Sequence, residues 1–305
     1  MKVTDYLLYL FYLVDSELEA MDFGRLRQRG PRPTLYDSEV ITIELAGEFL
    51  GFDTDEGIFD FFRRYHLSEF PNLARVCRTT FVRQAANLWR VKQRLHKRLL
   101  EQLPLNDPVD GEVLWLLDSF PLRTCKLARA PGCKLFRGLA SYGHDPSTPR
   151  DLFYGLRVHL RASDRGFCAQ LELTPASVAD IVAAPALAPP PGRYWGLCIG
   201  DRGYWTTPDR SVALRNSEMV LVAPFKKKST DPDPQRSAML SRLRQIIEPV
   251  IGQLTGRFHA GRTWARDLWH LCSRLTRKVL SHTAAVFLNI REGNPPLHLQ
   301  CLIDD

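Results

Sequence analysis

The chain has 305 residues, of which 45% are hydrophobic and 25% charged, so it can bury a core without disulfides or structural metals. No apolar run approaches the ~18 residues that a membrane-spanning helix needs, so no membrane partner is expected. A formal net charge of +7 and a pI of about 9.1 favour a polyanionic partner, nucleic acid first, although many soluble proteins are mildly basic.

The first apolar run, Leu7–Val14, is short and lacks a small-residue cleavage site, so we expect a buried helix there and not a signal peptide. The chain has seven widely spaced cysteines and no pair of Cys-x-x-Cys units. This spacing supports neither a zinc site nor a disulfide framework. We interpret them as reduced thiols, which are typical of a cytoplasmic protein.

The N-terminal third carries a helical pattern throughout. Helices are predicted at about residues 4–21, 34–50, 53–65 and 79–100. Gly51 is placed to end the second of these helices. The turn-rich stretch Pro104–Asp110 predicts a boundary between an all-helical domain, residues 1–104, and a second domain, residues 105–305.

Beyond this boundary the pattern changes to short apolar or alternating segments. They predict strands at about residues 112–117, 153–161, 167–173, 196–200 and 219–223, and helices at about residues 177–187, 237–254 and 263–288. Ser163–Gly166 is predicted to be the turn of a hairpin between the second and third strands. This element order predicts an α/β fold in which helices flank a mixed sheet, compatible with an RNase H-like core.

Two acids follow predicted strands of the second domain. Asp118 directly follows the first strand and Asp201 directly follows the fourth, and ligands of open sheets collect at the carboxyl ends of strands. Glu248 lies at the edge of the apolar stripe of the helix over residues 237–254, and Arg244, one turn earlier, points the same way. We therefore expect the three carboxylates to converge at this end of the sheet.

Converging carboxylates would not all stay charged without a cation, because like charges at close range raise pKa values. Mg²⁺ prefers oxygen ligands, and two such ions ~4 Å apart can activate a nucleophile and stabilise the leaving alkoxide in phosphodiester cleavage. A single acid at a strand end is more often a solvated loop residue, so this inference depends on the three acids together. We interpret the nearby Asp180, Asp209 and Glu218 as solvated acids that flank helices, and His159 as a structural histidine.

Several segments share the order and spacing of a known family. They are Tyr36–Ile43, Leu117–Leu122 with Cys125 soon after it, Tyr154–Leu160, Gly200–Tyr204 and Arg244–Glu248. Together they resemble transposases encoded by bacterial insertion sequences, in particular the subgroup whose catalytic core opens with Asp-Ser-Phe-Pro-Leu. The similarity spans nearly the whole chain from about Tyr36, and although Asp-Arg-Gly-Tyr alone is weakly specific, the motifs in order are strongly so.

The resemblance implies a DDE-class DNA transposase whose RNase H-like domain uses Mg²⁺ or Mn²⁺, two ions per active site. By position, Asp118, Asp201 and Glu248 match the catalytic, metal-binding acids, and Arg244 matches the arginine of the same signature. Such an enzyme cleaves the inverted repeats at transposon ends and joins them to target DNA. We expect it to act as a homodimer on DNA, associated with the nucleoid in a bacterial cytoplasm.

The chain also departs from this family's pattern. Related transposases often have Tyr three residues before the arginine and Lys seven residues after the glutamate, where this chain has Ser241 and Thr255. Pro249 lacks a backbone donor and disfavours helix at its predecessor. We expect either a helix that kinks at Glu248 or a new helix that begins at Pro249.

Basic residues mark three candidate DNA-contacting regions. Residues 72–100 contain eight lysines and arginines and no acid, and four of these form a stripe opposite the apolar side of the predicted helix. The stripe consists of Arg83, Arg90, Arg94 and Lys97. We expect it to contact DNA phosphates, and the alternative is a solvated surface helix. Lys226, Lys227 and Lys228 form a second region, for which a flexible charged loop is the alternative. The third region is a basic C-terminal segment with Arg257, Arg262, Arg266, Arg274, Arg277 and Lys278.

Two other functions remain open. An RNase H-like nuclease would cleave DNA without joining strands, and a DNA-binding protein would not cleave it at all. Strand-transfer products with inverted-repeat DNA would exclude the first alternative, and Mg²⁺-dependent cleavage would exclude the second.

Overall fold

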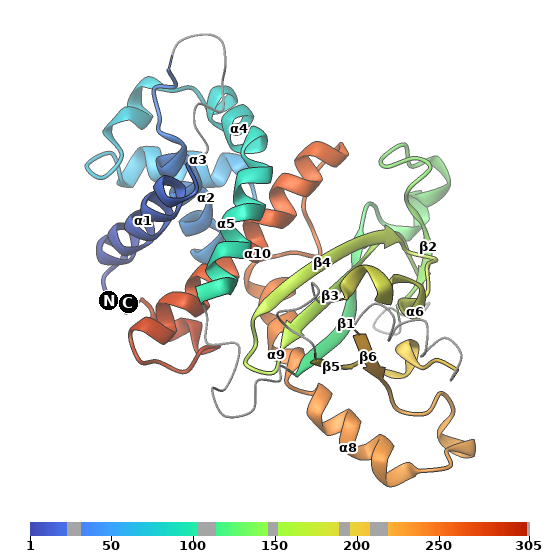
Figure 1. Ribbon diagram of the computed structural model, residues 1–305. Helices are drawn as coiled ribbons and strands as arrows, with labels where there is room; N and C mark the ends of the chain where they lie inside the picture. Colours follow the sequence, from blue (N-terminus) through green and yellow to red (C-terminus); the bar gives the residue numbers. More distant parts are fainter. Residues whose placement is uncertain (23–31, 103–113, 146–151, 189–195, 208–218, 304–305) are drawn as a thin grey trace. The chain divides into compact units, whose positions relative to one another are not determined.

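The computed structural model describes residues 1–22, 32–102, 114–145, 152–188, 196–207 and 219–303 (Figure 1). The chain forms two compact units, a helical unit of residues 1–103 with 254–305 and a sheet unit of residues 104–253. This grouping differs from the predicted second domain, residues 105–305, because residues 254–305 pack with the N-terminal helices. The predicted linker, Pro104–Asp110, lies outside the described residues.

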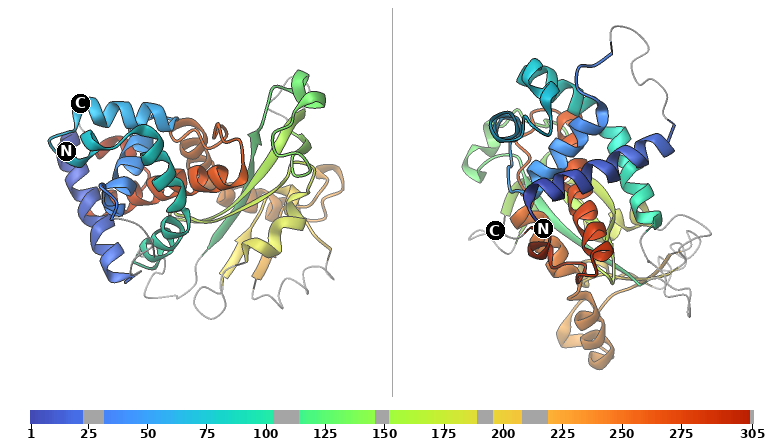
Figure 2. Two further views of the ribbon diagram at one scale, coloured as in Figure 1. Left: turned by 90° about the horizontal axis from the view of Figure 1, so that it is seen from above. Right: turned by 90° about the vertical axis from the view of Figure 1, so that its left-hand side faces the viewer.

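The helical unit has two largely buried helices, the second and the last, and its other helices pack around them. Its helices are α1 Val3–Ala20, α2 Asp37–Phe49, α3 Asp55–Tyr65, α4 Arg78–Asn87, α5 Trp89–Gln102 and α10 Leu268–Arg291, with 3-10 segments η1 Pro71–Arg75 and η7 Leu299–Cys301. The helix predicted over residues 79–100 divides at Leu88. Gly51 ends α2 as predicted, with a φ of +89° that glycine adopts without strain. Figures 1 and 2 show α10 among the N-terminal helices, where it packs against α2, α4 and α5.

A buried ion-pair network joins α2, α5 and α10. Lys92 Nζ lies 2.7 Å from Glu44 Oε2, and Lys278 Nζ lies 2.6 Å from Glu48 Oε2. Arg277 Nε donates to Glu48 Oε1 at 2.5 Å. All five side chains are at most 2% exposed, and charges are tolerated at such depth only when they are paired. Arg277 and Lys278 therefore belong to the core, and the prediction that these two residues contact DNA is wrong.

The sheet unit contains a curled, mixed sheet (Figure 2, left). Its strands are β1 Trp115–Arg123, β2 Ser141–His144, β3 Leu152–Ser163, β4 Cys168–Pro175, β5 Gly196–Ile199 and β6 Met219–Val222. They run in the order β2-β3-β1-β5-β6, with β4 paired to β3. The contacts of β3 with β1, β2 and β4 are antiparallel, whereas β1, β5 and β6 are parallel. The predicted hairpin is confirmed as β3 and β4, β2 was not predicted, and the topology is consistent with an RNase H-like fold.

Short helices cover this sheet. They are α6 Asp180–Ala183, α8 Pro234–Arg244 and α9 Ile247–Gly252, with 3-10 segments η2 Leu127–Gly132, η3 Ala184–Leu187, η4 Arg202–Tyr204 and η5 Lys228–Thr230, and the π-helical η6 Gln253–Arg257 follows α9. α9 packs against β1 and β3, α8 against β5, and η3 against β3 and β4. The helix predicted over residues 237–254 divides between α8 and α9, so Pro249 lies in the first turn of α9, where its missing N–H is tolerated.

Within the described ranges, no helix is long and apolar enough to span a membrane.

Candidate active site

Strand register brings Asp118 and Asp201 to one level of the sheet. Leu116 of β1 pairs with Ile199 of β5, and each acid lies two residues further along its chain. β5 ends there, whereas β1 stays paired to β3 as far as Arg123, so Asp118 lies inside β1 and not directly after it as predicted. The two acids therefore meet where a parallel strand ends beside one that continues, which is a place where ligands collect.

Asp118 is the more constrained of the two carboxylates. Its Oδ1 accepts a hydrogen bond from the Ser119 backbone N–H at 2.8 Å, and its Oδ2 accepts one from Arg244 Nη1 at 2.5 Å. Burial raises the pKa of Asp118 to about 6, although Arg244 opposes this shift, and the charge of Asp201 adds to it. A raised pKa means that the charged form of Asp118 is destabilised, and an additional positive charge nearby would stabilise it.

Asp201 is held by the turn that follows β5. Its Oδ1 accepts a hydrogen bond from the Gly203 backbone N–H at 2.9 Å. The Tyr204 hydroxyl donates to the Asp118 carbonyl oxygen at 3.3 Å, which ties this turn to β1. A side chain at Gly200 would come within 2.4 Å of Tyr204, so the turn requires glycine. Burial raises the pKa of Asp201, and the charge of Asp180 adds to this shift.

Glu248 reaches the site only through Arg244. Arg244 Nη2 lies 3.6 Å from Glu248 Oε1, one helical turn away, and the Glu248 side chain is 59% exposed. Across the residues that the structure describes, no three or more His, Cys, Asp or Glu side chains lie close enough together to hold a metal ion. The structure thus brings Asp118, Asp201 and Arg244 together, and the convergence of all three predicted acids around a cation stays a prediction.

The donor chemistry at this site fits a divalent cation. Asp118 and Asp201 supply hard oxygen ligands of the kind that Mg²⁺ and Mn²⁺ prefer. Both carboxyls have raised pKa values, with burial as the main cause and neighbouring acids as a further one. A cation placed between the two carboxylates would offset the repulsion between their negative charges, which Arg244 offsets only in part.

Three polar residues lie beside the acids: Asp180 was misinterpreted from sequence, Ser119 was missed, and His159 is the buried structural histidine that was predicted. Asp180 is half-buried and not solvated as predicted, because its Oδ1 accepts a hydrogen bond from Ser119 Oγ at 2.8 Å. The fully buried His159 has its Nδ1 3.3 Å from the same oxygen. Ser119 and His159 are direct partners in the β1–β3 register. The sequence signal for this pair is the alternation of side chains along β1, which places Ser119 on the same face as its cross-strand partner. Asp209 and Glu218 lie outside the described residues.

The predicted basic stripe is exposed on α4 and α5. Arg83, Arg90, Arg94 and Lys97 all face solvent, whereas the apolar side chains opposite them are buried, as predicted. These buried side chains are Phe81, Ala85, Leu88, Leu95 and Leu99. The guanidinium of Arg90 lies over the ring of Trp89, 5.3 Å from its centroid. Lys226, Lys227 and Lys228 are also exposed, directly after β6.

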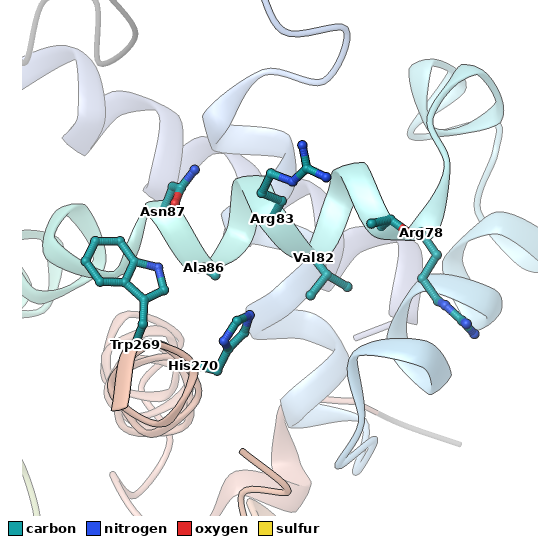
Figure 3. A pocket seen from close by; sticks show the side chains of 8 residues that line it. Arg78, Val82, Arg83, Ala86, Asn87, Trp269 and His270 are labelled. Atoms are coloured by element: carbon teal, nitrogen blue, oxygen red, sulfur yellow. The ribbon is translucent and has the colours of Figure 1, made fainter. Parts of the chain in front are cut away.

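A shallow pocket of about 410 Å³ lies beside this stripe, between α4 and the first turn of α10. Figure 3 shows Val82 and Ala86 of α4 on the side that faces Trp269 and His270. Arg83 also lines the pocket, and the Trp269 side chain is 46% exposed. An exposed indole beside an arginine is a combination that stacks on nucleic-acid bases as readily as on protein side chains.

Comparison with known proteins identifies a family that part of the chain matches. Residues 110–266 match the family described as a transposase DDE domain. This segment is slightly more than half of the 305-residue chain and includes Asp118, Asp201, Arg244 and Glu248. No curated protein and no solved structure matches the chain.

Proposed function

The chain belongs to the family of transposase DDE domains, and on that premise we propose that it cuts the DNA backbone at transposon ends and joins those ends to target DNA. The observation that carries this proposal is the pair of half-buried acids, Asp118 and Asp201, level with one another where β5 ends beside β1. Their raised pKa values mark a site that lacks positive charge, as a cation-dependent phosphoryl-transfer site does.

Asp118 and Asp201 would hold Mg²⁺ or Mn²⁺, with Glu248 as the third acid and two ions per site. Such ions, when bound, lower the pKa of a nucleophilic water or hydroxyl and stabilise the leaving alkoxide. Arg244 offsets the charge of Asp118 and contacts Glu248 in the absence of DNA. Since a guanidinium binds phosphate as well as carboxylate, the scissile phosphate would compete for Arg244 and release both acids.

The helical unit would bind the DNA ends. Arg83, Arg90, Arg94 and Lys97 form an exposed stripe without an acid between them, which suits contact with successive phosphates. Lys226–Lys228 would contact DNA nearer the acids of the sheet unit. A transposon has two inverted repeats, and the Asp118–Asp201 pair of one chain would act on one end, so joining both ends together would require a homodimer.

Oligonucleotides that carry the inverted repeats flanking the coding sequence test this function. With Mg²⁺, the wild-type chain should release the end and produce strand-transfer products on a target duplex. Asp118→Asn and Asp201→Asn should bind the same ends and lower both rates by ~10³-fold or more, since the amide keeps the shape and loses the charge.

Each other result identifies a different function. Cleavage without joined products would identify a nuclease of this fold. End binding without Mg²⁺-dependent cleavage would identify a DNA-binding protein that has lost catalysis. An Asp118→Asn variant that cuts at the wild-type rate would remove this residue from the catalytic set.

A further inference from the structure

A polar cluster lies on the face of the sheet opposite Arg244. It consists of Asp180, Ser119 and His159, and we call it the Asp180 cluster. Asp118 and Ser119 are successive residues of a regular strand, so their side chains point to opposite faces. The Asp118 carboxylate meets Arg244 on one face, and the Ser119 hydroxyl donates to Asp180 on the other.

The Asp180 cluster is held in place on several sides. His159 is fully buried, and its Nε2 shares a hydrogen bond with Thr174 Oγ1 of β4 at 2.8 Å. Arg157 of β3 donates through Nη1 to Ser119 Oγ at 3.2 Å. Its Nη2 donates to the His144 carbonyl oxygen of β2 at 2.6 Å. The cluster thus links Asp180 to β1, β2, β3 and β4, so its position is set by the sheet.

The same carboxylate also lies against the turn that carries Asp201. A Cβ atom at Gly203 would lie 2.6 Å from Asp180 Oδ2 and 3.0 Å from Asp201 Oδ1. Gly203 is therefore enclosed by the two carboxylates, and its backbone N–H donates to Asp201. Asp180 contacts the residue after Asp118 through one oxygen and crowds the Asp201 turn with the other.

We propose that Asp180 is a positioning residue, which acts through Ser119 and the Gly203 turn to hold the carboxylates of Asp118 and Asp201 in register for a shared divalent cation. The proposal rests on the transposase function proposed above. Asp180 contacts β1 beside Asp118 and lies against the turn that carries Asp201, and its charge adds to the negative potential around both acids. Residues that orient metal ligands in this way typically change metal affinity by ~10–100-fold when replaced.

Asp180→Asn in the full-length chain tests this role. The amide keeps an oxygen that accepts from Ser119, and it removes the charge beside His159 and Asp201. We expect calorimetric titration with Mn²⁺ alone to give an affinity at least ~10-fold weaker than wild type. The melting temperature and the affinity for DNA ends should stay within error. Asp164→Asn, which removes one charge at the β3–β4 turn of the same unit, is the matched control and should bind Mn²⁺ as wild type does.

Cleavage adds a readout that a merely structural role would not move. The Asp180→Asn variant should need ~10-fold more Mg²⁺ for half-maximal cleavage and should recover at high Mg²⁺, whereas Asp118→Asn should not recover. Ser119→Ala should show the same shift in smaller degree, and it serves as the test if Asp180→Asn does not fold. Wild-type Mn²⁺ affinity and wild-type Mg²⁺ dependence in both variants would overturn the proposal. A wild-type chain that does not cleave would overturn the proposed function, and Mn²⁺ titration would still test Asp180.

Discussion

Asp55 of the helical unit and Asp118 of the sheet unit differ in how far neighbouring cations balance their charge. Burial raises the pKa of Asp55 in the helical unit, yet Arg277 and Arg274 together bring it down to about 2. Burial also raises the pKa of Asp118 in the sheet unit, and Arg244 leaves it at about 6. Paired charges stabilise the fold around Asp55, whereas the charge of Asp118 is only partly offset, as the proposed function requires of an acid that binds a cation.

Removing one carboxylate from the buried ion-pair network should destabilise the helical unit. Glu48 contacts both Arg277 and Lys278, so Glu48→Gln would remove the carboxylate that Lys278 contacts and one of the carboxylates that Arg277 contacts. We expect a loss of ~3–5 kcal/mol in the free energy of unfolding, measured with urea. Asp60→Asn, an exposed acid on α3, is the control and should change stability by less than ~0.5 kcal/mol. A loss below ~1 kcal/mol in Glu48→Gln would mean that the network is not an important support of this unit.

The sheet unit should be stabilised by a divalent cation bound at Asp118 and Asp201. Mn²⁺ at 100 times its dissociation constant should stabilise the wild-type chain by ~2.7 kcal/mol, because it binds the folded state. Asp118→Asn and Asp201→Asn should lose most of this gain in a thermal-shift titration. Equal shifts in wild type and in both variants would place the cation elsewhere on the chain.

The two regions should respond to pH with opposite signs. The folded pKa of Asp118, about 6, lies above its ordinary value of 3.8, so its contribution to stability is greatest below pH 3.8 and is lost as pH rises through 6. Asp55, with a folded pKa of about 2, contributes stability above pH 3.8 that is lost as pH falls through 2.

Asp118→Asn should therefore gain on wild type by up to ~1.4 kcal/mol per pH unit between pH 4 and 6, in urea unfolding. Asp55→Asn should show no such gain in that window. A difference between Asp118→Asn and wild type that stays constant from pH 4 to 6 would contradict the raised pKa.

The smallest expected effect comes from a comparison of buried and exposed cations on one helix. On α5, Lys92 is buried and paired, whereas Arg90, Arg94 and Lys97 face solvent. Replacing these three with Ala should leave melting unchanged and should lower the slope of log affinity against log salt by about 0.9 for each DNA phosphate that the variant no longer neutralises. An unchanged slope in filter-binding or anisotropy titrations would mean that the stripe faces only solvent.

Local pattern determined much of this molecule. Alternating side chains predicted the β3–β4 hairpin, and Gly51 marked the end of α2. The short strands before Asp118 and Asp201 predicted their place on the sheet, because a buried strand and the residue after it are neighbours in the sequence itself. The proline after Glu248 correctly indicated an interrupted helix, although the break falls at Gln245 and Ile246.

Tertiary structure decided where charges are paired. Asp180, the first residue of α6, resembles a solvated acid in the sequence, but in the fold Ser119, 61 residues away, donates to it. Arg277 resembles a surface cation until α10 meets Glu48, 229 residues away. Local periodicity tells which face of an element is apolar, but the energy of a buried charge depends on partners that only the folded chain brings within contact distance.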